Sequence, residues 1–358
     1  MSNSLPNPGE VPPEIADLVR ERAEARGRHD WRVADELKAR IEAVGWRVTD
    51  RGKRSNASPA APPTAEIDGE LRYGSAAAVP SRLDEAATAE WTVVVVASEE
   101  PEPFSRLMTA LRAHAPAGTQ VVVVVNDPSA AQADALRPDS ADRGPIGGGA
   151  PEMVRTSVRL GYAAVLNIGL RRVAGELVLL ADGTAVPTAD ALTPLSAALH
   201  DPAVAAAGGC GLVAVDPGNP RPSALHRLDD AGGPSDVTAL EMGWLAFRRS
   251  DYAALGPLDE HFVTPAWLDA WWTLRLRAGA AGAEPASADD GTTADGGANA
   301  DATAPAHPEP AAFPARRAVA LPLPLERHAA PWPPDRTRLN RRNMYRVLDA
   351  LGWVEDLA

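Results

Sequence analysis

The chain carries two kinds of apolar pattern, and the first is helical. In residues 12–48, apolar side chains recur at intervals of three and four, the spacing of one helix face: Ile15, Leu18 and Val19, then Ala34, Leu37, Ile41 and Val44. Gly27 separates the two runs, and Asp30 stands where it can cap the second. The spacing predicts a hairpin of two helices within residues 1–54, followed by a short strand at 46–48.

After residue 90 the pattern changes to continuous runs of β-branched residues. Residues 92–98 read TVVVVAS and residues 120–127 read QVVVVVND, which suits strands buried on both faces of a parallel sheet. Helical spacing lies between them, and strand and helix patterns alternate further along: strands at 154–160, 176–182 and 203–215, helices at 103–114, 161–175 and 188–200. This alternation predicts an α/β fold with a mostly parallel sheet flanked by helices.

Three stretches combine Ala, Pro, Gly, Ser and Asp with few large apolar residues: 55–90, 131–151 and 280–312. Such segments bury too little apolar surface to offset the entropy lost on ordering. We therefore expect 55–90 to be a disordered linker between a hairpin module (1–54) and an α/β domain (91–358). The other two stretches are expected to be disordered insertions in that domain.

Composition narrows the functional classes. The chain of 358 residues has one cysteine, so neither an intrachain disulfide nor a cysteine zinc site is expected. The net charge is −13, and residues 1–54 carry 11 basic against 10 acidic residues, so strong nucleic-acid binding is not expected. The start lacks a signal-peptide pattern and no window is apolar enough for a membrane span, which predicts a cytoplasmic protein.

Polar residues follow three of the expected strands. They are Ser98 and Glu99, then Asn126 and Asp127, and finally Asp182 in the sequence Asp182-Gly183-Thr184. In open α/β sheets, ligands bind beyond the carboxyl ends of the strands, where free backbone donors of helix N-termini converge. The sequence therefore predicts a binding edge at these residues.

Seven segments in order resemble the family 2 glycosyltransferases, which have the GT-A (Rossmann-like) fold. They are VVVVASEEPEPFSRLMTAL, VVVVVNDPS, GYAAVLNIGLRRVAGELVLLADGTAVPTADAL, GWLAFRRSDYAALGPLDEHF, WLDAWWTLRLRAG, ALPLPLERH and RRNMYRVLDALG. The resemblance extends from about residue 92 to the C-terminus. It implies inverting transfer of a sugar from a nucleoside-diphosphate sugar to a hydroxyl of a glycan or lipid-linked acceptor.

The resemblance also implies roles for individual residues. Contacts to the nucleotide-sugar fall on Ser98, Glu99, Asn126, Asp127, Asn167 and Asp182. Asp182 and His328 would hold Mg²⁺ or Mn²⁺, which stabilises the charged leaving group. Asp269 would be the base that takes the acceptor proton. The acceptor side would comprise Asp259, Glu260, Trp271 and Trp272.

The chain departs from the family at two acidic motifs. The D-x-D motif ends in Thr184, and the E-D-x-D-L motif reads Leu268-Asp269-Ala270-Trp271-Trp272. A threonine hydroxyl is a weak neutral ligand, so any metal is expected to be weakly held. A catalytically impaired nucleotide-sugar-binding or scaffolding protein is therefore an alternative to the active enzyme.

Each candidate also has a purely structural interpretation. Asp182 can cap a turn, and Asp269 can lie on the exposed face of a helix. Trp271 and Trp272 at helical spacing are typical of a core. The Asp259-Glu260 pair can form a solvated turn, and His328 can lie on the surface.

The N-terminal hairpin resembles the small C-terminal helical segment of cysteinyl-tRNA synthetases. The matching residues are Asp30, Ala34-Asp35, Gly45 and Asp50. This resemblance implies an RNA-associated adaptor as a third functional hypothesis. The alternative is an amphipathic hairpin used for packing or self-association.

Overall fold

The computed structural model describes residues 11, 13–44, 46–51, 54–59, 62–67, 69–97, 100–137, 140, 142, 144–214, 225–228, 232–279, 316–328 and 341–347. The predicted insertion at 280–312 lies outside this part of the chain, as do Ser98 and Glu99.

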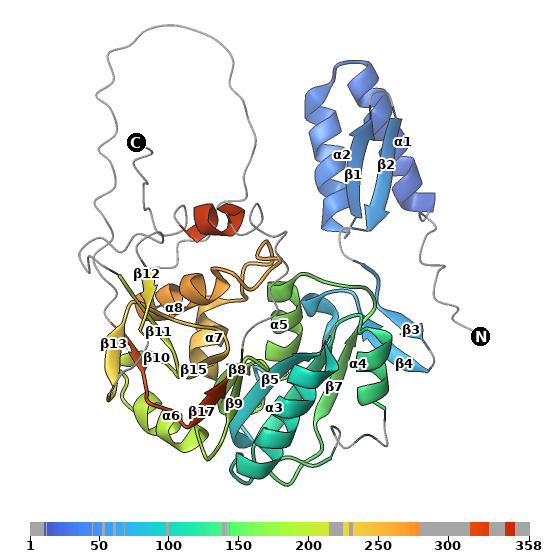
Figure 1. Ribbon diagram of the computed structural model, residues 1–358. Coiled ribbons are helices and arrows are strands. Elements are labelled where there is room, and N and C mark those ends of the chain that lie inside the picture. Colours follow the sequence, from blue (N-terminus) through green and yellow to red (C-terminus); the bar gives the residue numbers. More distant parts are fainter. Residues whose placement is uncertain are drawn as a thin grey trace, which may run out of the picture.

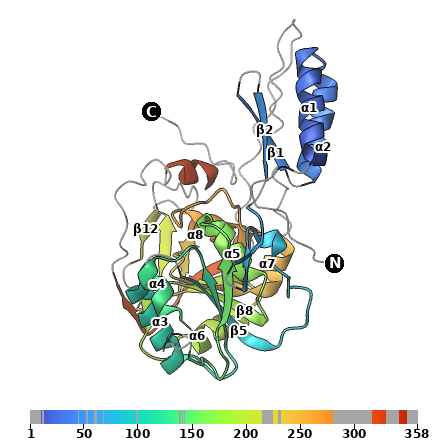
Figure 2. The same ribbon diagram turned by 90° about the vertical axis from the view of Figure 1, so that its right-hand side faces the viewer.

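The N-terminal module consists of two helices packed on a β-hairpin (Figures 1 and 2). Its elements are α1 (Pro13–Gly27), α2 (Trp31–Ala43), β1 (Trp46–Arg51) and β2 (Arg54–Pro59). The Asp30 carboxylate accepts a bond of 3.2 Å from the backbone N–H of Val33 and caps α2, as predicted. The helical hairpin and the strand after it are confirmed, and β2 extends the module beyond residue 54.

An ion cluster ties α1 to the hairpin. Two nitrogens of Arg22 donate to the two oxygens of Asp50 at 3.0 Å each, and Arg26 donates at 2.7 Å. The Ser55 hydroxyl adds a bond of 2.6 Å. The bond from Arg22 is the main cause that lowers the pKa of Asp50 to about 2, against the opposing effect of burial. This cluster stabilises the module at neutral pH.

The α/β domain is built on a ten-stranded sheet in the order β13-β16-β10-β15-β8-β5-β6-β7-β4-β3. Its central strands are β5 (Ala89–Ala97), β6 (Gln120–Val125), β7 (Glu152–Thr156) and β8 (Gly175–Ala181), all parallel to their neighbours in that group. One side is completed by β15 (Trp244–Arg248), β10 (Val204–Gly208), β16 (Arg317–Ala320) and β13 (Ser235–Val237). The predicted α/β class with a mostly parallel sheet is confirmed.

Helices cover both faces of the sheet (Figures 1 and 2). On one face, α3 (Pro101–His114) and α6 (Leu192–Leu199) bury their apolar sides against alternate strand residues such as Val93 and Val95, and α4 (Ala130–Ala135) lies against α3. The other face is covered by α5 (Tyr162–Leu170), α7 (Arg249–Leu255) and α8 (Leu268–Ala278), which pack against intervening residues such as Val94. Burial on both faces explains the unbroken valine runs.

Five short strands lie at the rim of this core. β11 (Gly211–Ala214) pairs with β12 (Leu225–Arg227) and β14 (Ala239–Leu240), and β17 (Leu325–Arg327) pairs with β9 (Ala185–Pro187). Residues 341–347 form a further helix. Among the described helices, none has the length and apolar character needed to cross a bilayer.

The predicted disordered linker at 55–90 is wrong for most of its length. Within it, β3 (Ala65–Ile67) and β4 (Glu70–Tyr73) extend the sheet beside β7, followed by the short helix η1 (Ala76–Ala78). These strands contain too few apolar residues to be ordered by their own burial. Pairing with β7 supplies their partners, and Ala76 and Val79 are buried against α5.

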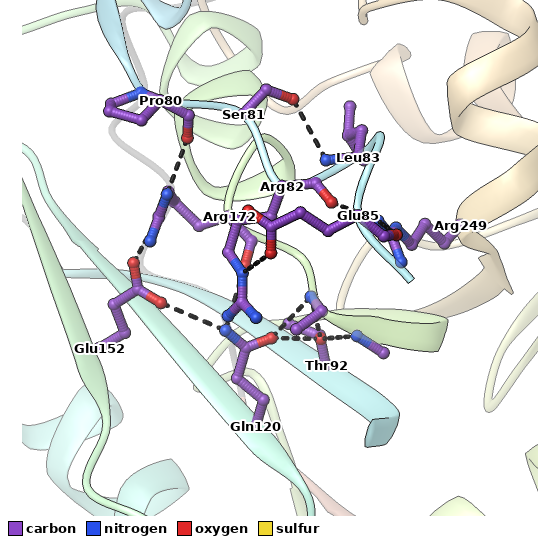
Figure 3. A network of polar contacts seen from close by, with 12 residues as sticks. Pro80, Ser81, Arg82, Leu83, Glu85, Thr92, Gln120, Glu152, Arg172 and Arg249 are labelled. Atoms are coloured by element: carbon purple, nitrogen blue, oxygen red, sulfur yellow. Dashed lines mark hydrogen bonds and ion pairs between the residues drawn. The ribbon is translucent and has the colours of Figure 1, made fainter. Parts of the chain in front are cut away.

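Backbone carbonyls hold the rest of this segment. Arg172 donates to the Pro80 carbonyl at 2.8 Å and to Glu152 at 2.5 Å, and Arg249 donates to the carbonyls of Arg82 and Glu85 (Figure 3). Side chains far along the chain therefore order a stretch whose own composition predicts disorder.

The described part of the predicted insertion at 131–151 is also ordered. Ser129 caps α4 by accepting a bond of 3.1 Å from Gln132, and Leu136 and Ile146 are buried in the core under α3. Two apolar anchors are enough to fix a loop whose remaining residues are small and polar.

Candidate functional site

A cavity of about 650 Å³ lies at the carboxyl end of β8. Asp182 and Thr184 follow this strand, and Glu241 to Gly243 precede β15, which runs antiparallel beside it with Trp244 opposite Ala181. The N-terminus of α8, the end of β17, residues 209–212 and Arg227 form the remaining walls. We call this space the strand-end cavity. It lies beyond the carboxyl ends of the strands, where α/β sheets bind their ligands.

The Asp182-Gly183-Thr184 loop is a tight turn that also lines the cavity. One carboxylate oxygen of Asp182 accepts both the backbone N–H of Thr184, at 2.9 Å, and the Thr184 hydroxyl. A side chain at residue 183 would come within 2.4 Å of the Pro103 carbonyl, so only glycine fits there. The capping interpretation and the cavity-lining interpretation of Asp182 therefore both hold.

Burial raises the pKa of Asp182, and the negative charge of Glu241 adds to the rise. The two bonds from Thr184 act in the opposite direction but do not cancel it. Asp182 therefore holds its negative charge less firmly than an exposed aspartate.

Asp269 lies in the first turn of α8 and lines the same cavity. Its carboxylate accepts a bond of 2.8 Å from the backbone N–H of Ala270. Burial raises the pKa of Asp269 to about 7, with a further contribution from the charge of Glu241, while backbone N–H groups of Ala270 and Met242 oppose the rise. A carboxylate that titrates near neutrality can accept a proton from a bound hydroxyl and release it again.

Two aromatic residues adjoin these carboxylates. Trp267, which lines the cavity and precedes α8, has φ of 70°, a left-handed conformation that is strained for a bulky residue. Tyr162 begins α5, and burial together with the charges of Asp182 and Asp269 raises the pKa of its phenol. The phenol therefore stays neutral near both carboxylates.

Three basic side chains also line the cavity: Arg227 on β12, Arg327 on β17 and His328 after it. Arg227 donates to Glu241 at 2.8 Å and to the sulfur of the buried Cys210 at 3.1 Å. Arg327 lies 3.8 Å from the same Glu241 carboxylate oxygen and donates to the Gly209 carbonyl at 2.5 Å. One carboxylate thus faces two guanidinium groups.

The described residues offer few ligands for the metal ion that the family resemblance implies. Among them, no group of three or more His, Cys, Asp or Glu side chains is arranged to hold an ion. One oxygen of Asp182 is already engaged by Thr184, whose hydroxyl stands where the second carboxylate of D-x-D is expected. A single half-engaged carboxylate is a poor donor set for Mg²⁺ or Mn²⁺, which prefer several oxygens.

The structure brings three of the predicted site residues together: Asp182, Asp269 and His328. The two residues predicted to follow the second strand and the one in α5 are placed elsewhere. Asp127 is exposed with φ of 47° and does not line the cavity. Asn126 and Asn167 are buried and line no part of it.

Both asparagines serve the fold. The Asn126 side chain donates to the Leu160 carbonyl at 3.1 Å and accepts from the Leu160 N–H at 2.9 Å. The Asn167 amide donates to Leu258 and Glu260, and its oxygen accepts from Leu258 and Tyr252. Nucleotide contacts predicted for these side chains would require them to break bonds that already satisfy them.

The predicted acceptor residues lie outside the cavity as well. Trp271 and Trp272 are 4% and 0% exposed, and Trp272 packs edge-on against Phe247 and Tyr252, so both indoles belong to the core. Asp259 caps a turn by accepting bonds from His261, and Glu260 accepts from Asn167. None of these four residues lines the cavity.

Sequence reasoning missed several cavity residues, namely Cys210, Arg227, Glu241, Trp267 and Arg327. They come from separate strands and loops, so no local spacing links them. The adjacent pair Arg327-His328 is the one sequence signal for these cavity residues. These basic residues follow Glu326 at the end of the apolar stretch ALPLPL.

Comparison with known families gives two matches. Residues 92–263 match the family described as glycosyl transferase family 2, and residues 9–56 match the cysteinyl-tRNA ligase anticodon binding domain. Both resemblances drawn from the sequence are confirmed. Residues 92–263 are therefore similar to a family 2 glycosyltransferase domain, and residues 9–56 are similar to the anticodon binding domain. The first match ends before Asp269 and His328, so their roles remain predictions.

Solved structures give more distant likenesses. The mannosyltransferase PcManGT from Pyrobaculum calidifontis, in complex with GDP-Man and Mn²⁺, is 19% identical over 56% of this chain and 55% of that chain, with a TM-score of 0.41. GalNAc-T7 with UDP, GalNAc and Mn²⁺ is 13% identical over 73% and 48%, with a TM-score of 0.49. TarS from S. aureus is 15% identical over 52% and 33%, with a TM-score of 0.34.

The chain thus spans about half or less of the length of these three proteins. No curated protein matches it significantly.

Proposed function

We propose that the protein transfers a sugar from a nucleoside-diphosphate sugar to a hydroxyl of a glycan or lipid-linked acceptor, with inversion at the anomeric carbon. The observation that carries this proposal is that Asp269, with its pKa near 7, shares a cavity with Asp182 at the binding edge of a family 2 domain. A base near neutrality can take the acceptor proton, and a carboxylate can accept hydrogen bonds from the donor.

In the proposed reaction, the acceptor oxygen attacks the anomeric carbon while Asp269 takes the hydroxyl proton. The bond from that carbon to the diphosphate oxygen breaks, and its electron pair leaves with the nucleoside diphosphate. Attack opposite the leaving group inverts the anomeric centre. Asp182 contributes the carboxylate oxygen that Thr184 leaves free, as an acceptor for donor hydroxyl groups.

No step of this reaction relies on a metal held by the protein. A Mg²⁺ or Mn²⁺ ion in the cavity is expected to be held weakly, because the described residues offer it no group of three ligands and burial raises the pKa of Asp182.

The test is release of nucleoside diphosphate from a panel of UDP-, GDP-, ADP- and dTDP-sugars with mixed glycan and polyprenyl acceptors. Asp269→Asn should reduce release about 100-fold or more, because general-base contributions are of that order. Asp134→Asn, which changes an exposed carboxylate on α4 outside the cavity, is the matched control and should leave release unchanged. Binding of a nucleotide-sugar without release by the unaltered protein would refute the transferase and favour the impaired binding protein.

The family match at residues 9–56 supports a second candidate, an RNA-binding role of the N-terminal module. Its basic and acidic residues nearly balance, and Arg22 and Arg26 are already paired with Asp50, so binding should be weak and sensitive to salt. Titration of the full chain with tRNA at 50 and 200 mM salt tests this role. Equal affinity of a chain lacking residues 1–54 would refute it.

A further inference from the structure

Basic residues border Thr184 in the strand-end cavity, at the position where the family pattern has an acidic residue. Strand β17 pairs antiparallel with β9, with Arg327 opposite Ala185, and the backbone N–H of His328 donates to the Thr184 carbonyl at 2.7 Å. Two basic residues are thus fastened beside Thr184, where the family pattern places a metal-binding carboxylate.

Arg227 enters the same cavity from β12, and its partners leave part of its guanidinium free. Its side chain is 49% exposed and that of Arg327 is 41% exposed, and both face the single carboxylate of Glu241. Glu241 can neutralise only one of the two charges. This wall of the cavity therefore carries excess positive charge.

His328 adds an unused polar atom. Its Nε2 is buried and has no hydrogen-bond partner among the described residues, and the nearest carboxylate oxygen, on Glu326, is 3.6 Å away. A buried nitrogen without a partner costs stability unless a ligand supplies one.

We propose that Arg227, Arg327 and His328 bind the diphosphate of the donor and carry most of the charge neutralisation that the family assigns to a metal. This inference rests on the proposed function. Guanidinium groups keep their charge at all relevant pH values and present parallel N–H donors that fit phosphate oxygens. They would stabilise the diphosphate as it takes the electron pair of the breaking sugar bond.

The test is calorimetric titration with UDP, GDP, ADP and dTDP, with EDTA or with Mn²⁺. For the diphosphate that binds, EDTA should change the affinity of the unaltered protein less than about threefold. Arg227→Gln and Arg327→Gln should each weaken it about tenfold or more, because each removes a charged hydrogen bond to phosphate. Arg327→Lys should fall between, since a lysine keeps the charge but not the planar fork.

Arg317→Gln is the matched control, because Arg317 is 48% exposed, pairs with Asp201 and Asp236 and lies outside the cavity. It should leave the affinity unchanged. Thermal melting of each variant separates lost binding from lost folding.

Other outcomes would overturn the inference. Affinity that disappears in EDTA but survives both arginine substitutions would refute it while leaving the proposed function intact. Farnesyl phosphate, a stand-in for a lipid-linked acceptor, is titrated in the same way. If the arginine substitutions weaken the binding of farnesyl phosphate alone, the basic wall belongs to the acceptor side instead. Failure of every nucleoside diphosphate to bind the unaltered protein would refute both proposals.

Discussion

The raised pKa of Asp269 should make the folded protein less stable at neutral pH than a variant without this charge. The pKa is about 7 in the folded protein and 3.8 for an unperturbed aspartate. A group whose pKa is higher in the folded state contributes stability below its unfolded pKa and loses that contribution as the pH rises toward the folded value. The loss falls between about pH 4 and pH 7 and amounts to about 4 kcal/mol.

Asp269→Asn removes the titration while preserving an oxygen that can accept the Ala270 N–H. The free energy of unfolding, measured by urea denaturation at several pH values, should be similar for both proteins near pH 4. At pH 8 the variant should be more stable by about 4 kcal/mol at most. The titration of all other groups is common to both proteins, so it cancels in the difference between their free energies of unfolding.

Val158→Ala serves as the control for this measurement, because it changes an exposed side chain that carries no titratable group and lies outside the cavity. Its difference from the unaltered protein should stay constant with pH. An Asp269→Asn difference that also stays constant between pH 4 and pH 8 would contradict the raised pKa and, with it, the role of Asp269 as a base that titrates near neutrality.

Three further predictions concern other parts of the chain. Thr184→Asp restores the second carboxylate of D-x-D and should tighten Mn²⁺ binding about tenfold or more by calorimetry; unchanged affinity would show that this position does not face the ion. Asp50→Asn should destabilise the N-terminal module by about 2 kcal/mol at pH 7, because the folded pKa is about 2 against 3.8. That stability is present above pH 4 and disappears as the pH falls toward 2, and faster hydrogen exchange in residues 46–59 of the variant at pH 7 reports it; unchanged exchange would count against the cluster. Trp272→Ala should lower the free energy of unfolding by about 3–5 kcal/mol, as for a core aromatic, whereas a lost acceptor contact alone would leave stability unchanged.

The main sheet could be predicted from the sequence because its signal is local. The valine runs of β5 and β6 are apolar on both faces, and no other soluble arrangement suits them as well. The strands β3 and β4 escaped prediction because their order comes from pairing with β7 and from packing near η1. Composition indicates how much apolar surface a segment can bury by itself. It does not include the strand pairing and packing that residues distant in the sequence provide.

The residues of the candidate site likewise divide into those with a local sequence signal and those without one. Asp182 was predictable because it directly follows a buried strand, but the same rule failed for Asn126, whose amide closes a loop instead. A polar residue at a strand end can serve either purpose, and only its hydrogen-bond partners distinguish the two. Glu241 and Arg227 had no local signal, because the pairing of short strands brings them to the cavity.

The charges of the strand-end cavity depend on one another. Glu241 raises the pKa of both Asp182 and Asp269, while it also pairs with Arg227 and faces Arg327. A diphosphate bound to the two arginines would compete with Glu241 for them and add negative charge nearby, and both changes favour protonation of Asp269. Departure of the diphosphate would reverse them and favour release of the proton. The same carboxylate would thus link binding of the leaving group to the affinity of Asp269 for its proton.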